Sequence, residues 1–260
     1  MKTKMRHTAR FILCISLMFE LAAQAQDKSP SAYSGAKEDL HIYLLIGQSN
    51  MAGRAPITKE QEAVITNGYL LNADSQWEPA KNPLNRYSTI RKGLGMQKLN
   101  PGYSFAEAML RAQKGISIGL IVNAKGGSKI GQWKKGTRFY NDAVKRAQEA
   151  QKTGTLKGIL WHQGESDNGK PDGYIDQLEE LVKDLRSELK APKLPFVAGQ
   201  VNNAEAINKQ IGQLPKTLPD TGYVSSEGLK AMDRWHFDTK IMLLLGEGYA
   251  KEMLKIQQEN

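Results

Sequence analysis

Cysteine is almost absent from this 260-residue sequence. Its single cysteine, Cys14, lies within the first 25 residues, and residues 26–260 contain none. This absence excludes a disulfide, a thiolate nucleophile and a cysteine metal site from that part of the chain. Histidine is scarce as well, since residues 26–260 contain only His41, His162 and His236. Any chemistry that needs an imidazole therefore has three candidates.

The sequence also lacks the motifs of nucleotide-binding and metal-binding proteins. It contains neither a G-K-[ST] phosphate loop nor a G-x-G-x-x-G fingerprint, and it offers no convincing set of metal ligands. The formal net charge is +9, but the basic residues are scattered and form neither a basic helix nor an alternation with aromatic residues. We therefore expect no cofactor, no metal and no nucleic-acid partner.

The first 25 residues have the pattern of an export signal. Four Lys/Arg side chains precede an apolar run at 11–19, and Ala23 and Ala25 occupy the two positions that a signal peptidase reads. The run is too short for a membrane anchor, and Glu20 interrupts it. We predict cleavage after Ala25, a secreted or periplasmic protein, and no stable membrane association once the signal is removed. The sequence does not indicate an oligomeric state.

The remaining chain alternates between two kinds of apolar pattern. Residues 26–40 are polar and predict a linker, and residues 41–260 predict one domain. Near-continuous apolar runs, typical of buried parallel strands, lie at 41–46, 116–123, 156–162 and 194–201, with weaker runs at 69–71 and 222–225. Helical spacing of apolar residues marks 104–114, 139–152, 174–185 and 241–256. This alternation predicts an α/β fold, a three-layer α/β/α sandwich with a central parallel sheet.

Two motifs suggest nucleophilic catalysis. Ser49 directly follows the first predicted strand in Gly47-Gln48-Ser49-Asn50-Met51, on a tight turn that precedes a helix. Serine needs a base within hydrogen-bond reach, and in Asp233-Arg234-Trp235-His236 an acid stands three residues before a histidine, where it can orient the imidazole. The simpler interpretations are a serine that caps a helix and a surface histidine beside an acid.

Two further motifs follow predicted strands and supply hydrogen-bond donors. Gly126-Gly127-Ser128 permits a close approach of the backbone to a ligand, and the Gln163 side chain can donate to a developing oxyanion. Each motif alone also fits an ordinary polar turn. Because ligands bind beyond the carboxyl ends of parallel strands, we expect all of these groups on one rim of the sheet.

Together these strings resemble the SGNH hydrolase superfamily. Within it, the chain is most similar to the sialate O-acetylesterase-like proteins and to carbohydrate esterase family 6, the acetyl xylan esterases. The resemblance covers residues 41–254. It rests on GQSNMAG at 47–53, AKGGSKIGQW at 124–133, ILWHQGESD at 159–167, LPFVAGQ at 194–200, VSSEGL at 224–229 and DRWHFD at 233–238.

The resemblance implies a flavodoxin-like SGNH fold and a set of residue roles. Ser49 matches the nucleophile, His236 the base and Asp233 the acid that orients it. The oxyanion donors match the Ser49 backbone, Gly127 and the Gln163 side chain. The candidates for substrate binding or support are Gln48, Asn50 and Glu165. Glu165 stands where this branch has an acid, which leaves open whether it shares the role of Asp233.

These roles imply a serine carbohydrate O-acetylesterase that works through an acetyl-enzyme intermediate, and the signal pattern of residues 1–25 implies that it is secreted. We expect an acetylated carbohydrate as its substrate, with acetylated xylan or a related glycan preferred over sialic acid acetyl esters. Two alternatives stay open: a sialate O-acetylesterase, and a non-catalytic carbohydrate-binding protein on the same fold. A lipase or thioesterase of the same superfamily fits less well because the segments around the motifs are polar. Trp77, Trp133 and Trp235 are candidates for stacking on a sugar, although tryptophans more often pack in cores.

Overall fold

The structure is a computed structural model that describes residues 32–91 and 93–259. The predicted export signal at 1–25 lies outside the described residues, and so does the part of the predicted linker up to residue 31. Residues from 32 onward belong to one compact unit, and the first strand of its sheet begins at Leu40.

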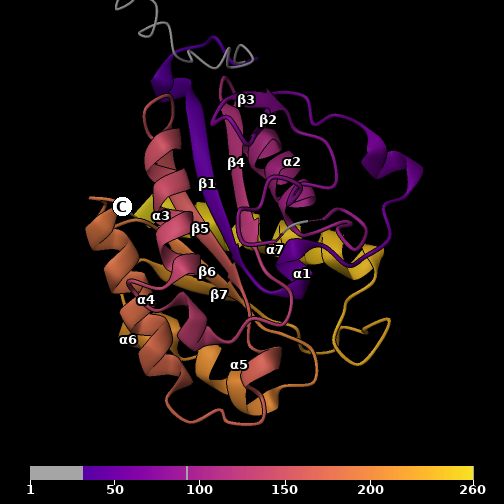
Figure 1. The fold of residues 1–260 in the computed structure, drawn as a ribbon, viewed down its shortest axis with the longest axis vertical. Helices are drawn as coiled ribbons and strands as arrows, with labels where there is room; N and C mark the ends of the chain where they lie inside the picture. Colours follow the sequence, from indigo (N-terminus) through magenta and orange to yellow (C-terminus); the bar gives the residue numbers. More distant parts are fainter. Residues whose placement is uncertain (1–31, 92, 260) are drawn as a thin grey trace, which may run out of the picture. The chain divides into compact units, whose positions relative to one another are not determined.

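Seven strands of the described chain form one sheet in the order β3-β2-β4-β1-β5-β6-β7 (Figure 1). Their bounds are β1 (Leu40–Gly47), β2 (Gly68–Leu71), β3 (Trp77–Pro79), β4 (Ser117–Ala124), β5 (Thr155–His162), β6 (Phe196–Gly199) and β7 (Thr221–Val224). All neighbouring strands run parallel except β3, which pairs antiparallel with β2 at the edge. The predicted central parallel sheet is confirmed, with a short antiparallel strand added to it.

The strand order places a topological switch point beside β1. Apart from β2 and β3, which extend one side of the sheet, the order β4-β1-β5-β6-β7 is the flavodoxin-like one, in which the chain continues on both sides of its first strand. The register brings the three central strands to an end together, because Gly47 is opposite Ala124 in β4 and His162 in β5. The segments after these strands therefore emerge side by side.

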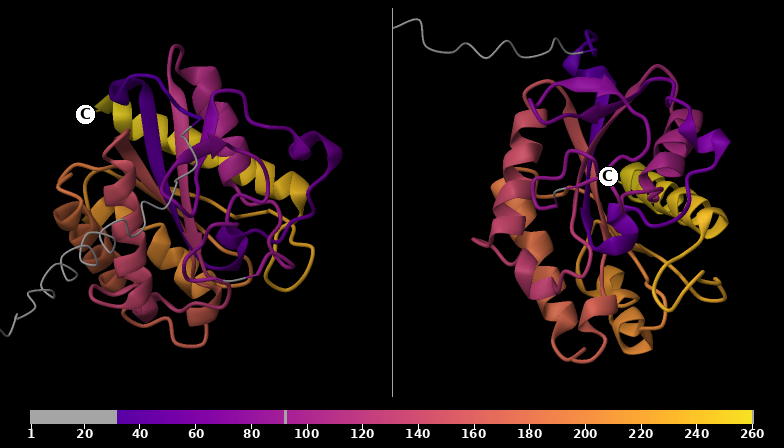
Figure 2. Two further views of the ribbon diagram at one scale, coloured as in Figure 1. Left: turned by 45° about the horizontal axis from the view of Figure 1, so that its top comes forward. Right: turned by 45° about the vertical axis from the view of Figure 1, so that its right-hand side comes forward.

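Helices cover both faces of the sheet (Figures 1 and 2). Their bounds are α1 (Ser49–Ala52), α2 (Gly102–Ala112), α3 (Arg138–Ala150), α4 (Tyr174–Glu188), α5 (Glu205–Ile211), α6 (Leu214–Thr217) and α7 (Thr239–Glu259). Figure 1 shows α3 and α4 on one face and α2 and α7 on the other. None of the helices within the described residues is both long and apolar enough to cross a bilayer.

The sheet has one hydrophobic core on each face, and this explains why the central strands are continuous apolar runs in the sequence. In β1, Leu44 and Ile46 pack into the core beneath α3 and α4, whereas Tyr43 and Leu45 pack into the core beneath α2 and α7. Because successive side chains of a strand point to opposite faces, a strand covered on both sides must be apolar at every position. The predicted three-layer α/β/α sandwich is thereby confirmed.

Candidate active site

Ser49 lies at the switch point of the sheet, as the first residue of α1. It follows β1 by two residues, and its side chain is buried. The turn depends on Gly47, which has φ +139° and lies so close to the His162 carbonyl that a Cβ atom would collide with it. The Gln48 N–H donates to that same carbonyl at 2.8 Å. Glycine therefore lets β1 and β5 end in contact, and this contact fixes where Ser49 stands.

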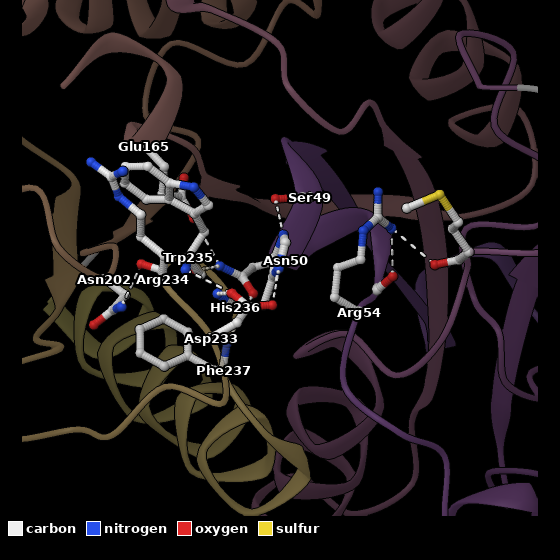
Figure 3. Close-up of polar contacts among 12 residues, drawn as sticks. Ser49, Asn50, Arg54, Glu165, Asn202, Asp233, Arg234, Trp235, His236 and Phe237 are labelled. Atoms are coloured by element: carbon white, nitrogen blue, oxygen red, sulfur yellow. Dashed lines mark hydrogen bonds and ion pairs between the residues drawn. The ribbon is translucent and has the colours of Figure 1, made fainter. Parts of the chain in front are cut away.

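His236 approaches Ser49 from the loop at 225–238, between β7 and α7. Its Nε2 lies 3.0 Å from the Ser49 hydroxyl oxygen, and its Nδ1 lies 2.8 Å from Oδ2 of Asp233 (Figure 3). The carboxylate keeps a proton on Nδ1 and so leaves Nε2 free to accept the serine proton. An isolated bridge between Ala231 and Phe237 closes the base of this loop.

Asp233 is held by the backbone of its own loop. Its Oδ1 accepts hydrogen bonds from the N–H groups of Trp235 and His236, both at 2.8 Å. Burial acts to raise the pKa of Asp233, but these N–H groups and the His236 imidazole outweigh it and lower the pKa. Asp233 therefore stays a carboxylate, although about half of its side chain (51%) is exposed to solvent.

Asn50 and Glu165 form a buried hydrogen-bonded pair, and Asn50 also contacts the loop that carries His236. The Asn50 amide donates to Glu165 Oε1 at 2.8 Å and to the Trp235 carbonyl at 3.1 Å, and its Oδ1 accepts from the Phe237 N–H at 3.4 Å. Burial raises the pKa of Glu165 to about 8, against the opposing effects of a backbone N–H and the Asn50 amide. Its Oε2 is buried without a hydrogen-bond partner among the described residues.

Two backbone N–H groups beside Ser49 are candidates to bind an oxyanion. Neither the Ser49 N–H nor the Gly127 N–H donates a backbone hydrogen bond within the described part of the chain. Gly127 has φ +72°, and apart from its own and its neighbouring residues no described residue has an atom within 4 Å of the position its Cβ would take. The glycine thus provides a turn that other residues rarely adopt and leaves open space over it.

Gln163 lies fully buried in a network that joins the segments after β1, β4 and β5. Its amide nitrogen contacts Gln48 Oε1 at 3.1 Å, the Ser128 carbonyl at 2.9 Å and Asp167 Oδ2 at 2.6 Å. Since an amide nitrogen has two hydrogens, these acceptors already engage both. The geometry assigns Gln163 to holding the Gly127 loop in place, and its role as an oxyanion donor stays a prediction.

Gln48 has a bridging position in the same network. Its Oε1 accepts from the Gln163 amide and, at 3.3 Å each, from the N–H groups of Gly164 and Ser166. The residue before the nucleophile therefore orders the loop after β5. All three predicted supporting residues make buried contacts around Ser49 and His236: Gln48, Asn50 and Glu165.

The imidazoles of the other described histidines contact residues other than Ser49. His162 is fully buried at the end of β5, and its Nδ1 lies 2.9 Å from the Tyr249 hydroxyl. Burial lowers the pKa of His162 to about 3, so the imidazole stays neutral. His41 contacts Gln113 at 3.3 Å near the start of β1, at the opposite end of the strand from Ser49.

The prediction that three tryptophans could stack on a sugar is wrong for two of them. Trp77 and Trp133 are buried in the core, so neither is available to stack on a sugar. Trp235 is partly exposed beside His236, and the guanidinium of Arg234 lies over its ring at 4.5 Å. Of the three candidates, Trp235 alone lies where it can meet a ligand of Ser49.

One charged residue near Ser49, Arg54, was not predicted from the sequence. The Arg54 side chain is half-buried beside Gly126, close to Ser49 (Figure 3). A single arginine among 36 Lys and Arg residues carries no signal of its own, although it directly follows the GQSNMAG string.

Comparisons with known proteins agree with the fold and identify a family. A family model described as carbohydrate esterase, sialic acid-specific acetylesterase, matches residues 39–255. A probable carbohydrate esterase of Arabidopsis thaliana is 32% identical over 236 residues, which cover 82% of this chain and 90% of that protein.

Solved structures are similar over most of the chain. An X-ray structure of an Arabidopsis thaliana protein has a TM-score of 0.75 and 30% identity, covering 84% of this chain and 98% of its own. NanS has a TM-score of 0.69 at 15% identity, with 87% and 100% covered. A carbohydrate acetylesterase from Xanthomonas citri has a TM-score of 0.63 at 19% identity, with 85% of this chain and 57% of that chain covered. The last two likenesses support the fold alone.

Proposed function

The chain belongs to the carbohydrate esterase family of sialic acid-specific acetylesterases, and we propose that it removes acetyl groups from a carbohydrate by a Ser-His-Asp mechanism. The observation that carries the proposal is the line of contacts from Ser49 to His236 to Asp233, at 3.0 Å and 2.8 Å. A nucleophile, a base and a group that orients the base, each within hydrogen-bond distance of the next, are the parts that acyl transfer requires.

The first half of the reaction transfers the acetyl group to the protein. The Ser49 oxygen attacks the acetyl carbonyl carbon while its proton passes to His236 Nε2. The tetrahedral intermediate collapses by breaking the bond to the sugar oxygen, which takes the proton from His236 and leaves as an alcohol. Asp233 stabilises the imidazolium that exists between these two proton transfers.

The second half releases acetate. A water molecule gives a proton to His236 Nε2 and attacks the acetyl-enzyme carbonyl, and the Ser49 oxygen then leaves with that proton. In both halves the carbonyl oxygen becomes negative, and the N–H groups of Ser49 and Gly127 are the donors we assign to it, with Gln163 as the third predicted donor. Their open positions next to the nucleophile support this assignment.

The sugar is the finer part of the proposal. The sequence predicts acetylated xylan or a related glycan, and the alternative is an acetyl ester of sialic acid, which the family description favours. Export of the protein after removal of residues 1–25 is a proposal that rests on the sequence pattern of that segment.

Acetate release tests this function. Purified protein that starts at Gln26 is incubated with acetylated xylan, with O-acetylated sialic acid and with a small aryl acetate, beside the Ser49→Ala variant. Release by the wild type that is lost in the variant supports a serine acetylesterase, and the faster sugar substrate identifies the substrate class. Sugar binding without release from any of the three would favour a non-catalytic carbohydrate-binding protein instead.

A further inference from the structure

A large open groove lies beyond the ends of β6 and β7, and we call it the amide groove. It is lined by residues 168, 200–206, 208–209 and 226–229 and has a volume of about 1010 Å³. Sites for small molecules typically enclose roughly 300–1,000 Å³, so the groove has room for a ligand at the large end of that range. Figure 1 shows α5, which supplies part of the wall, at the same end of the sheet as α1. The amide groove and Ser49 therefore lie on the same rim.

The amide groove shares a wall with the catalytic loop. The loop at 225–238, which carries His236, also supplies part of the lining. Asn202, from the segment after β6, donates its amide to the Arg234 carbonyl of this loop at 2.9 Å (Figure 3). Trp235 is partly exposed and lies between Arg234 and His236 in the chain. The groove therefore adjoins the site on the side of its base.

Side-chain amides hold the shape of the groove. The Asn208 amide pairs with both backbone groups of Val201, because it accepts from the Val201 N–H at 2.8 Å and donates to the Val201 carbonyl at 2.7 Å. The Gln200 amide donates to the Asn208 carbonyl at 2.9 Å. The segment after β6 is therefore ordered before a ligand arrives, which lowers the entropic cost of binding.

Other amides of the groove have polar atoms that are not engaged. Asn168 donates to the Asn203 carbonyl at 2.9 Å, and Asn202 donates to the Arg234 carbonyl, so each uses its amide nitrogen. Within the described part of the chain, the Oδ1 atoms of Asn168 and Asn202 accept no hydrogen bond, and the exposed Asn203 side chain makes none. An amide whose nitrogen is held presents its oxygen in a fixed direction, ready to accept from a ligand hydroxyl.

The charges of the groove argue against an anionic ligand. Glu205 and Glu227 are exposed in its lining and outnumber the exposed Lys209. The rest of the lining is mostly amide, hydroxyl and short apolar groups, so it offers no extended apolar surface either. A sugar hydroxyl both donates and accepts, and it thus matches amide N–H groups together with amide and carboxylate oxygens. The lining therefore fits neutral sugar units.

We propose that the amide groove binds neutral sugar units of a chain whose acetylated unit is presented to Ser49. The proposal rests on the acetylesterase function and adds to it that the substrate is an acetylated oligosaccharide or polysaccharide rather than a free sugar. Asn168, Asn202 and Asn203 are the residues that we assign to the chain. The groove thus sets a preference for chain length and not for the acetylated sugar itself.

Pairs of substrates that differ only in the chain test the proposal. We compare kcat/KM on acetylated xylotetraose with that on acetylated xylose, and kcat/KM on O-acetylated sialyllactose with that on free O-acetylated sialic acid. We expect the chain to be preferred by at least about tenfold in one pair, because its additional hydroxyls gain hydrogen bonds in the groove. The pair with the larger preference identifies the kind of chain. Equal values within both pairs would overturn the proposal.

Two variants test the groove itself. Asn203→Gly removes an unengaged side chain, and glycine keeps the backbone there, which has φ 56°. Ala206→Leu places a bulky apolar side chain at another exposed position of the lining. In each variant we expect the ratio of kcat/KM on the chain to kcat/KM on the single sugar to fall by about threefold to tenfold. Equal losses on chain and single sugar in both variants would overturn the proposal.

The matched control is Asn67→Gly. Asn67 is also exposed and has φ 57°, but it lies just before the first residue of β2, at the opposite end of the sheet from Ser49. The same substitution there is expected to leave the ratio at the wild-type value. A fall in the control that equals the fall in Asn203→Gly would contradict a role of the amide groove.

Binding of chains that carry no acetyl group separates this proposal from the acetylesterase function. Calorimetry of Ser49→Ala is expected to show at least about tenfold tighter binding of xylotetraose than of xylose, or of sialyllactose than of sialic acid. Ser49→Ala/Asn203→Gly is expected to lose about threefold to tenfold of the affinity for that chain. Chain binding that persists while acetate release fails would contradict the acetylesterase function alone. Acetate release with equal affinities for chains and single sugars would overturn the proposal and leave the function intact.

Discussion

The amide nitrogen of Asn50 lies 2.8 Å from Glu165 Oε1, and this contact joins the residue after the nucleophile to the loop after β5. The same nitrogen lies 3.1 Å from the carbonyl of Trp235, the residue before the base. Asn50 is fully buried and Glu165 nearly so, and polar contacts are stronger in such an environment than in water. We infer that this buried pair positions His236 relative to Ser49 without taking part in the proton transfers.

Replacing Asn50 by alanine tests this positioning role. The change removes the donor to Glu165 and to the His236 loop, so we expect kcat to fall by about a hundredfold through misplacement of the base. The control is Asn202→Ala, because Asn202 also donates to a carbonyl of that loop, that of Arg234, at 2.9 Å, but from a more exposed position. A similar small loss in both variants would show that the Glu165 contact does not position His236.

The raised pKa of Glu165 predicts that the stability of the folded protein depends on pH. Burial raises its pKa from the ordinary value of 4.5 to about 8, so the folded protein binds this proton more tightly than the unfolded chain. The stabilising contribution is complete below about pH 4.5 and is lost as the pH rises toward 8. Glu165→Gln mimics the protonated acid and keeps an oxygen for Asn50.

Urea unfolding of the wild type and Glu165→Gln between pH 5 and pH 8 measures this effect. We expect the free energy of unfolding of the wild type to decrease relative to the variant as the pH rises across this interval. Parallel curves would mean that Glu165 is ionised in the folded protein throughout, and its carboxylate would then have to be counted among the charges around His236.

Asp233→Asn tests the orientation of the base. The new amide group would face Nδ1 of His236 and favour a proton on Nε2, where Ser49 needs an acceptor. We expect kcat to fall by about 10² to 10⁴, with thermal unfolding close to that of the wild type because Asp233 is half-exposed. If turnover persists near the wild-type value, the acid's role belongs elsewhere, and Glu165 becomes the candidate.

Gln163→Ala is expected to affect both stability and turnover. Its buried amide donates to the Ser128 carbonyl and to Asp167 Oδ2, which also accepts from the Ile130 N–H. Removal leaves the Ser128 carbonyl without this donor and destabilises the protein by about 1–3 kcal/mol. Release of the Gly127 loop, with loss of a predicted oxyanion donor, lowers kcat by about 10² to 10³. Urea unfolding and steady-state kinetics measure the two effects separately, and an unchanged kcat would remove Gln163 from the catalytic account.

Most of the architecture could be predicted from apolar runs because the central strands are covered on both faces. The run at 41–46 became β1, and the run at 156–162 became β5, each within one residue at its ends. The edge strand β3 was missed because three residues ending in a proline, within a segment rich in glycine and proline, show no strand pattern. Helix α5 was missed because Ile207 and Ile211 are its only buried residues, too few for a periodic signal.

The site could be predicted where chemistry fixes the residue type. Ser49, His236 and Asp233 stand in short motifs after strands, and the structure brings them into a chain of contacts. The hydrogen-bond partners of Gln163 could not be predicted. A glutamine that donates to an oxyanion and one that holds two loops together by hydrogen bonds look the same in a sequence. Arg54 was missed because its place beside Gly126 follows from the folding of two separate segments, which the sequence does not show.

Identification of the residue that carries the acetyl group shows whether Ser49 is the nucleophile. The protein is mixed with an activated aryl acetate, quenched in acid during turnover and digested, and the modified peptide is sequenced by mass spectrometry, with a fluorophosphonate label as a stable substitute. We expect one acetyl or phosphonyl group on Ser49, and none on the corresponding peptide of Ser49→Ala. A modification on any other residue, or acetate release that survives Ser49→Ala, would contradict it.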